Sequence, residues 1–195
     1  MKRYSLLFLG LAVLIFSCNA QGNNNAKPTE APKAAASDTA IKWLTFEEAL
    51  NLNETAPKKI FIDFYTDWCG WCKVMDKNTF KDPNVIKLMN KYFYPVKFNA
   101  EQREPIDFKG KTYTFIDQGG RGYHELAAAI MQGQLSYPTF MFLTPDFQII
   151  TPLQGYVKKE DFEPIVNYLG QDFFMPEKNM VWEDYKAKYK PGQGL

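Results

Sequence analysis

Metal-binding side chains are scarce in this chain, which has three cysteines and one histidine among 195 residues. A structural zinc site takes four ligands, drawn mostly from these two residue types. Cys69, Cys72 and His124 leave such a site one ligand short once Cys18 is set aside, so we expect no metal. A phosphate loop is also missing, because Gly119–Gly122 lacks the spacing and the Lys-Ser/Thr pair of that motif.

An excess of either charge is absent as well. The chain has 23 basic and 22 acidic residues and a formal net charge of +1, so this balance favours neither a nucleic acid nor an anionic membrane surface as a partner. Its length, with 46% hydrophobic and 16% aromatic residues, suits one globular domain with extensions.

The N-terminal apolar run, Leu6–Phe16, is too short to span a bilayer comfortably. It follows Lys2 and Arg3, which is the pattern of a signal peptide. We therefore assign residues 1–17 to a signal peptide and expect the rest of the chain to be exported.

Ser17-Cys18 at the end of this run resembles a bacterial lipoprotein signal, whose cysteine is lipidated and becomes the new N-terminus. Residues 18–40 are polar, small and proline-bearing, as in a flexible tether. We expect a protein of the bacterial periplasm that is held on a membrane by a lipid at Cys18. Simple secretion with cleavage nearby and a retained signal anchor are the alternatives.

Helix and strand patterns alternate after the tether. The expected helices are Thr45–Ala56, Cys69–Phe80, Asp82–Phe93 and Lys158–Phe173, and the expected strands are Lys59–Thr66, Tyr94–Ala100, Pro138–Thr144 and Phe147–Gly155. This order predicts an α/β fold, with a central mixed sheet flanked by helices on both faces.

Cys69 and Cys72 stand three positions apart at the start of an expected helix, just after an expected strand. In an exported chain they can pair with each other or with a partner protein. A purely structural disulfide here would close a very small loop and restrict the unfolded chain little, which favours a redox centre. A helix N-terminus stabilises a thiolate, so Cys69 is the expected nucleophile, and Cys72 is placed to resolve a mixed disulfide.

Residues 41–170 resemble the thioredoxin superfamily. The segments "DFYTDWCGWCK" (63–73) and "TFKDPNV" (79–85) look most like the C-terminal periplasmic domain of the membrane electron transporter DsbD and related single-domain lipoproteins. The match includes "WCGWCK", an acid six residues before Cys69, and a proline ahead of a strand in "SYPT". The resemblance implies the thioredoxin fold, with an insert at about 101–136 before the strand that follows the proline.

The resemblance also implies roles for residues around the two cysteines. Asp63 would be a buried acid that accepts the proton of Cys72, with Lys97 as its possible partner. Pro138 would be cis, which leaves the backbone of Tyr137 free to pair with an incoming peptide. The alternatives are an Asp63 that faces solvent at a strand end and a Lys97 that is an ordinary solvated lysine.

Trp68, Gly70 and Trp71 would form the substrate-binding surface, with Trp68 covering the sulfurs, although the two tryptophans fit half-buried packing as well. The dipeptide between the cysteines contains no histidine, a residue typical of oxidising relatives. Its absence favours a reducing protein.

The insert and the tail are less defined. A hairpin is expected around Lys109–Lys111, a flexible joint at Gly119–Gly122 and a helix at Tyr123–Met131, on which His124 has no catalytic task. Residues 171–195 form an expected helical tail that packs on the domain or, alternatively, binds a partner.

These patterns together predict a tethered extracytoplasmic thiol-disulfide oxidoreductase that reduces disulfides in other exported proteins. We expect no cofactor, no nucleic acid partner, a monomer, and contact with the membrane through the lipid anchor only. By family analogy the electrons would come from a membrane donor of DsbD type. An oxidase or isomerase using the same cysteines, and a non-catalytic client-binding module, are the alternatives.

Overall fold

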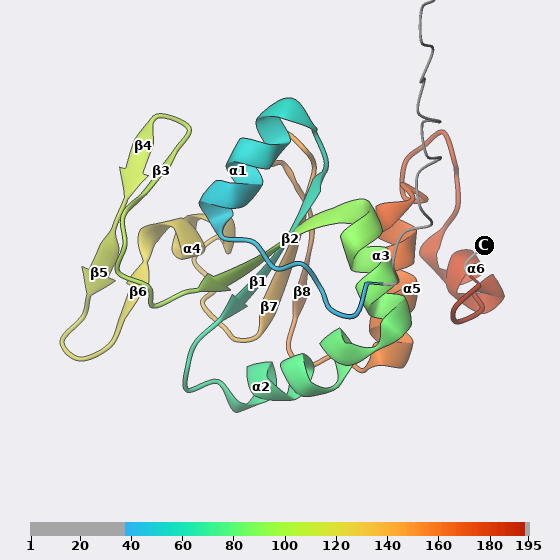
Figure 1. Cartoon of the computed structure of the whole chain (residues 1–195), viewed down its shortest axis with the longest axis horizontal. Coiled ribbons are helices and arrows are strands. Elements are labelled where there is room, and N and C mark those ends of the chain that lie inside the picture. The colour runs from blue at the N-terminus through green and yellow to red at the C-terminus, as the bar shows by residue number, and fades with distance from the viewer. Residues whose placement is uncertain (1–37, 194–195) are drawn as a thin grey trace, which may run out of the picture. The chain divides into compact units, whose positions relative to one another are not determined.

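A four-stranded mixed sheet lies at the centre of residues 38–193, the part of the chain that this computed structural model describes (Figure 1). The strand order is β2-β1-β7-β8. Strand β2 (Phe93–Asn99) runs parallel to β1 (Lys59–Tyr65), whereas β7 (Thr139–Leu143) is antiparallel to β1 and to β8 (Ile149–Gln154). The predicted mixed sheet is therefore confirmed.

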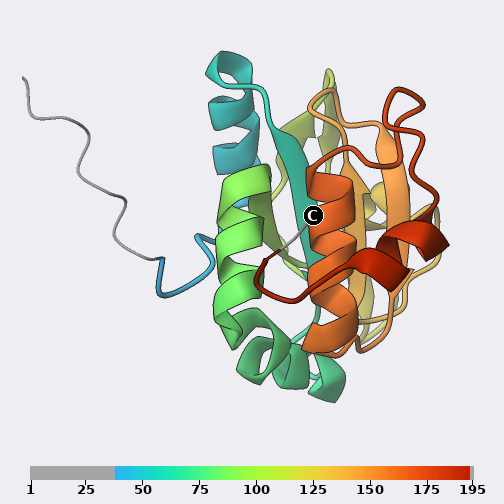
Figure 2. The same cartoon turned by 90° about the vertical axis from the view of Figure 1, so that its right-hand side faces the viewer.

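Helices cover both faces of this sheet (Figures 1 and 2). Helices α1 (Phe46–Thr55) and α4 (Glu125–Ile130) lie on one face, and α3 (Pro83–Tyr92) and α5 (Lys159–Gly170) lie side by side on the other. Helix α2 (Gly70–Lys77) follows the end of β1. This is the predicted thioredoxin fold.

Local sequence signals set where the helices begin. The Thr45 hydroxyl accepts a hydrogen bond from the Glu48 N–H, and the Glu48 carboxylate accepts one from the Thr45 N–H, so that a capping box starts α1. Asp82 caps α3 through the amides of the second and third helical residues, and Pro83 occupies the first helical position. Both helix starts were predicted from these residues.

Two hydrophobic cores lie on opposite faces of the sheet because side chains of a strand alternate. Ile60, Ile62 and Phe64 of β1 pack in the core that also holds buried side chains of α1 and α4. Phe61 points the other way, into the aromatic core under α3 and α5. Asp63 shares the alternation of Phe61 and is 1% exposed, so β1 carries an acid on its aromatic face.

The prediction of one helix over Cys69–Phe80 is wrong at its end. Helix α2 stops at Lys77, and a separate 3-10 turn, η1 (Thr79–Lys81), follows. The Thr79 hydroxyl donates a hydrogen bond to the Val157 carbonyl at 2.8 Å, a contact with the loop before α5. This long-range contact fixes the break, and the local pattern contains no sign of it.

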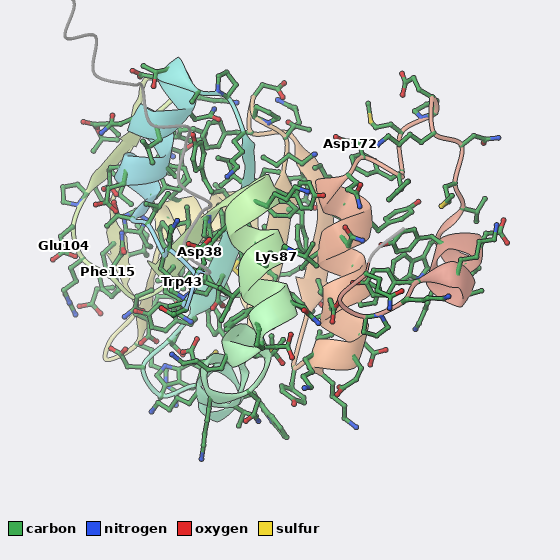
Figure 3. The ribbon with its side chains drawn as sticks, turned by 45° about the vertical axis from the view of Figure 1, so that its right-hand side comes forward. Asp38, Trp43, Lys87, Glu104, Phe115 and Asp172 are labelled. Atoms are coloured by element: carbon green, nitrogen blue, oxygen red, sulfur yellow. A yellow bond between two sulfur atoms is a disulfide. The ribbon has the colours of Figure 1, made fainter. Side chains whose placement is uncertain are left out.

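The predicted insert contains two hairpins. The first joins β3 (Ile106–Phe108) to β4 (Lys111–Tyr113) around Gly110, as predicted. In the second, β5 (Phe115–Asp117) pairs with β6 (Gly122–His124). Figure 3 shows Glu104 and Phe115 together on the insert side of the domain, away from α3.

Two predictions for the insert are corrected by the second hairpin. Gly119 and Gly120 have positive φ angles and form its turn, and Gly122 is the first residue of β6, so the segment predicted as a flexible joint is a hairpin turn. Tyr123 and His124 belong to β6, and the predicted helix starts only at Glu125. The glycine-rich turn reverses the chain and pairs residues that the local pattern assigns to a helix.

The C-terminal tail lies against α5 through a short helix, α6 (Trp182–Lys188; Figure 2). Tyr185 is fully buried, and its ring centroid lies 5.0 Å from that of Tyr168 on α5. The predicted signal peptide, the lipidation site at Cys18 and most of the tether lie outside the described residues. Within residues 38–193, no helix is both long enough and apolar enough to cross a membrane.

Candidate functional site: a disulfide at a helix N-terminus

Cys69 and Cys72 form a disulfide where β1 leads into α2. Cys69 is the N-cap residue of α2, and its sulfur accepts a hydrogen bond from the Cys72 N–H at 3.1 Å. The Cys69 N–H donates to the Thr66 carbonyl at 3.1 Å, which folds the connecting loop back on the strand end. The helix N-terminus therefore points the Cys72 amide at the Cys69 sulfur, a position that stabilises a thiolate.

Two tryptophans stand beside this disulfide and face solvent. Trp68 is 60% exposed and Trp71 is 61% exposed, whereas the cysteines are 4% and 3% exposed. Trp68 packs edge-on against Tyr137, and Trp71 lies at 5.3 Å from the ring of Tyr156. The nearly buried sulfurs are thus flanked by exposed aromatic rings that suit contact with another molecule.

Gly70, the third residue predicted for substrate binding, is the first residue of α2 and is exposed. A Cβ atom there would meet no other atom within 4 Å. A larger residue would therefore fit at position 70 without a steric clash.

The peptide bond between Tyr137 and Pro138 is cis. The Pro138 carbonyl accepts a hydrogen bond from the Gly155 N–H at 2.8 Å, at the edge where β7 and β8 pair. Within residues 38–193, neither the N–H nor the C=O of Tyr137 has a hydrogen-bond partner. Both groups are therefore available for a strand-like pairing with a bound peptide.

Asp63 and Lys97 meet because they occupy partner positions on the adjacent parallel strands β1 and β2. The Lys97 Nζ lies 2.6 Å from the Asp63 Oδ2. The other carboxylate oxygen of Asp63 is buried and has no hydrogen-bond partner among the described residues. Burial raises the pKa of Asp63 to about 6, although the charge of Lys97 opposes this shift.

A second carboxylate, which sequence analysis missed, also contacts Lys97. The Lys97 Nζ donates a hydrogen bond to Asp76 on α2. Burial lowers the pKa of Lys97, but the two carboxylates outweigh it and the net shift is upward. Asp76 has a side chain that is 45% exposed, so this chain of charges runs from the buried Asp63 to solvent.

Three aromatic rings surround the same ammonium. Lys97 Nζ lies between 5.0 and 5.5 Å from the ring centroids of Trp43, Tyr65 and Phe80. Trp43 is labelled in Figure 3. Cation–π contacts therefore help to hold the lysine at Asp63.

Glu101 was missed as well. The Trp68 Nε1 donates a hydrogen bond to Glu101 Oε1 at 2.9 Å, and the Arg121 guanidinium lies 5.9 Å from the Trp68 ring centroid. Glu101 lies two residues after the end of β2, and Arg121 comes from the second hairpin of the insert. No local pattern in the sequence indicated this contact, because it joins the active-site loop to residues of the insert.

His124 does not belong to the site. It is fully buried, its Nδ1 accepts a hydrogen bond from the Leu126 N–H, and its Nε2 lies 3.0 Å from the Glu104 carbonyl. Burial lowers the pKa of His124, which fits a neutral ring that caps α4. Residues 38–193 hold no group of three or more His, Cys, Asp or Glu side chains arranged to bind a metal.

Comparisons with known proteins agree with this geometry. A family model named Thioredox_DsbH, described as "Protein of unknown function, DUF255", matches residues 31–183. The thiol:disulfide interchange protein DsbD of Campylobacter jejuni is 30% identical over 95 residues, which cover 47% of this chain and 17% of DsbD. The uncharacterized protein B0495.5 of Caenorhabditis elegans is 28% identical over 112 residues, which cover 57% of this chain and 13% of that protein.

A solved thioredoxin structure from Thermus thermophilus is similar in fold, with a TM-score of 0.53 and 18% identity over 72% of this chain and 98% of the thioredoxin. The aligned part of this chain spans less than a fifth of the length of the two curated relatives. The family and the Cys69–Cys72 pair support thiol-disulfide exchange as the general chemistry of the site.

Proposed function

The chain belongs to this thioredoxin-like family, and on that premise we propose that it is an extracytoplasmic thiol-disulfide oxidoreductase that reduces disulfides in exported proteins. The observation that carries the proposal is the Cys69–Cys72 disulfide at the N-terminus of α2, with the exposed Trp68 and Trp71 beside it in the chain. In this proposal the structure shows the oxidised form of the protein, which is the product of the reduction of a client.

The proposed reaction starts from the dithiol form. The Cys69 thiolate attacks a client disulfide, a bond forms between Cys69 and one client sulfur, and the other client sulfur leaves as a thiolate. Cys72 then loses its proton and attacks the Cys69 sulfur, which forms the Cys69–Cys72 disulfide, breaks the bond between Cys69 and the client, and releases that client sulfur as a thiolate. The client gains two electrons and this chain loses two, with protons taken up by the client thiolates.

Asp63 is the proposed acceptor of the Cys72 proton. It lies on the face of β1 that also carries Phe61, and Phe61 and Met75 of α2 belong to the same core. A pKa of about 6 lets this carboxylate be ionised near neutral pH and still bind a proton readily. Lys97 and Asp76 hold it in position and link it to solvent.

Exposed aromatic rings and a free backbone form the proposed client site. The Tyr137 N–H and C=O would pair with the client backbone beside its cysteine, and Trp68 and Trp71 would cover its apolar side chains. No bound cofactor takes part, because the dithiol carries the electrons.

The electron source and the location are also parts of the proposal. A reductase in an oxidising compartment needs a donor, and the similarity to DsbD suggests a membrane transporter of that type. Export rests on the signal-like residues 1–17, and membrane attachment rests on a lipid at Cys18. A Cys18→Ala variant that still sediments with membranes would argue against the anchor.

The deciding experiment equilibrates the full chain with dithiothreitol and glutathione buffers and follows tryptophan fluorescence. We expect a midpoint potential nearer the roughly −270 mV of thioredoxin than the roughly −120 mV of DsbA. An oxidising midpoint would indicate an oxidase or isomerase instead. A disulfide that never exchanges would leave a non-catalytic binding module.

A further inference from the structure

A cleft of about 520 Å³ opens on the side of α2 that lies away from the insert. Its walls come from the end of α2, from η1 and from the loop that enters α5. Four lysines line it: Lys77, Lys81, Lys158 and Lys159. We call it the lysine cleft.

The lysine cleft adjoins the active site through Tyr156. Tyr156 lines it, and the Tyr156 ring lies 5.3 Å from the ring of Trp71, the residue directly before Cys72. Trp71 is 61% exposed. A molecule that fills the cleft and extends past Tyr156 would therefore touch Trp71 beside the disulfide.

Positive charge is concentrated in this cleft, although the whole chain has a formal net charge of only +1. Lys159 pairs with Asp82 at 3.2 Å, but Lys77, Lys81 and Lys158 form no ion pair within residues 38–193. Asp82 is itself occupied as the cap of α3. Glu160 also lines the cleft but forms no ion pair with these lysines in the described part of the chain, so three exposed ammonium groups stay unpaired around it and lysines outnumber carboxylates four to two in the lining.

We infer that the lysine cleft binds a carboxylate-rich segment of the protein that exchanges its disulfide with Cys69. The inference rests on the proposed function. Because the cleft lies beside the disulfide, the segment that fills it would belong to the protein whose disulfide reacts with Cys69. A polypeptide with acidic residues near its cysteine meets both conditions. Opposite charges at such a rim speed association and orient the partner.

The test uses three synthetic probes that share one disulfide loop and differ only in a tail of glutamates, glutamines or lysines of equal length. The reduced full chain is mixed with each probe, and tryptophan fluorescence gives the rate of probe reduction. We expect the glutamate-tailed probe to react about tenfold faster than the glutamine-tailed probe at low salt, and the lysine-tailed probe to react slowest. About 0.5 M salt should remove most of this difference.

The double variant Lys77→Glu/Lys158→Glu should reverse the order of the tails, and Lys77→Gln/Lys158→Gln, a milder change to the fold, should abolish it. The matched control is Lys87→Glu/Lys188→Glu, which changes the net charge equally at exposed lysines outside the cleft. Lys87 lies on α3 (Figure 3). The control should keep the preference for glutamate.

Binding is measured separately with probes in which serine replaces both cysteines. If no probe is reduced, the proposed function fails, and these serine probes still decide the inference. Tighter binding of the glutamate tail that is lost in the Lys77/Lys158 variants supports it. Equal rates and affinities for all tails, or a preference that survives both Lys77/Lys158 variants, would overturn it. Binding to phosphatidylglycerol vesicles without any tail preference would overturn it as well, in favour of a lipid surface.

Discussion

Replacing Asp63 by Asn should stabilise the oxidised protein at neutral pH. Asp63 is 1% exposed, and one of its carboxylate oxygens has no hydrogen-bond partner among the described residues. Burial raises its pKa from an ordinary 3.8 to about 6, so the ionised form is penalised in the folded state. That difference corresponds to about 3 kcal/mol of lost stability above the folded pKa, as an upper bound.

The sign of this effect follows from linkage. The folded state holds the Asp63 proton more tightly than the unfolded state, so this carboxyl destabilises the fold fully above about pH 6 and ceases to do so below pH 4. Asn has nearly the same shape and no charge. We therefore expect Asp63→Asn to raise the free energy of unfolding by about 1–3 kcal/mol at pH 7.5, and to raise it little near pH 4.

The assay is urea unfolding of the oxidised wild type and variant at both pH values. Asp76→Asn is the control, because the Asp76 side chain is 45% exposed and its contact with Lys97 should contribute no more than about 1 kcal/mol. A loss of stability in Asp63→Asn at pH 7.5, or a gain that is equal at both pH values, would refute the argument. In that case the ion pair with Lys97 would outweigh the burial of the acid.

Three further outcomes are expected. Cys72→Ser should trap Cys69 in mixed disulfides with clients, which non-reducing electrophoresis detects, and an absence of adducts under mild oxidation would contradict the assigned roles. Gly122→Ala should cost about 1–3 kcal/mol in urea unfolding, because its Cβ would lie 2.2 Å from the Phe115 ring; wild-type stability would show that the hairpin adjusts freely. Tyr185→Ala should cost about 3–5 kcal/mol, because this side chain of α6 is fully buried and packs on Tyr168 of α5; a change below about 1 kcal/mol would mean that α6 adds no stability to the domain.

Much of the fold could be predicted from local patterns. Thr45 and Asp82 indicate the starts of two helices, because their side chains accept hydrogen bonds from backbone amides only two or three residues away. The order of helices and strands then leaves few ways to bury the apolar faces, and the mixed sheet followed. The prediction for α2 failed at Lys77, where a contact with Val157, far away in sequence, accompanies the end of the helix. The prediction for the insert failed at Gly119–Gly122, where two glycines with positive φ angles make a hairpin turn.

The candidate site divides in the same way. By itself the sequence determined the Cys69/Cys72 pair, because the spacing and the helix start are both local. Only the tertiary structure decided that Asp76 would join Lys97, since α2 and β2 meet through packing of segments 21 residues apart. The lysine cleft unites Lys77 with Lys158 for the same reason. A cluster of charges depends on which distant surfaces fold together, and no local pattern encodes that.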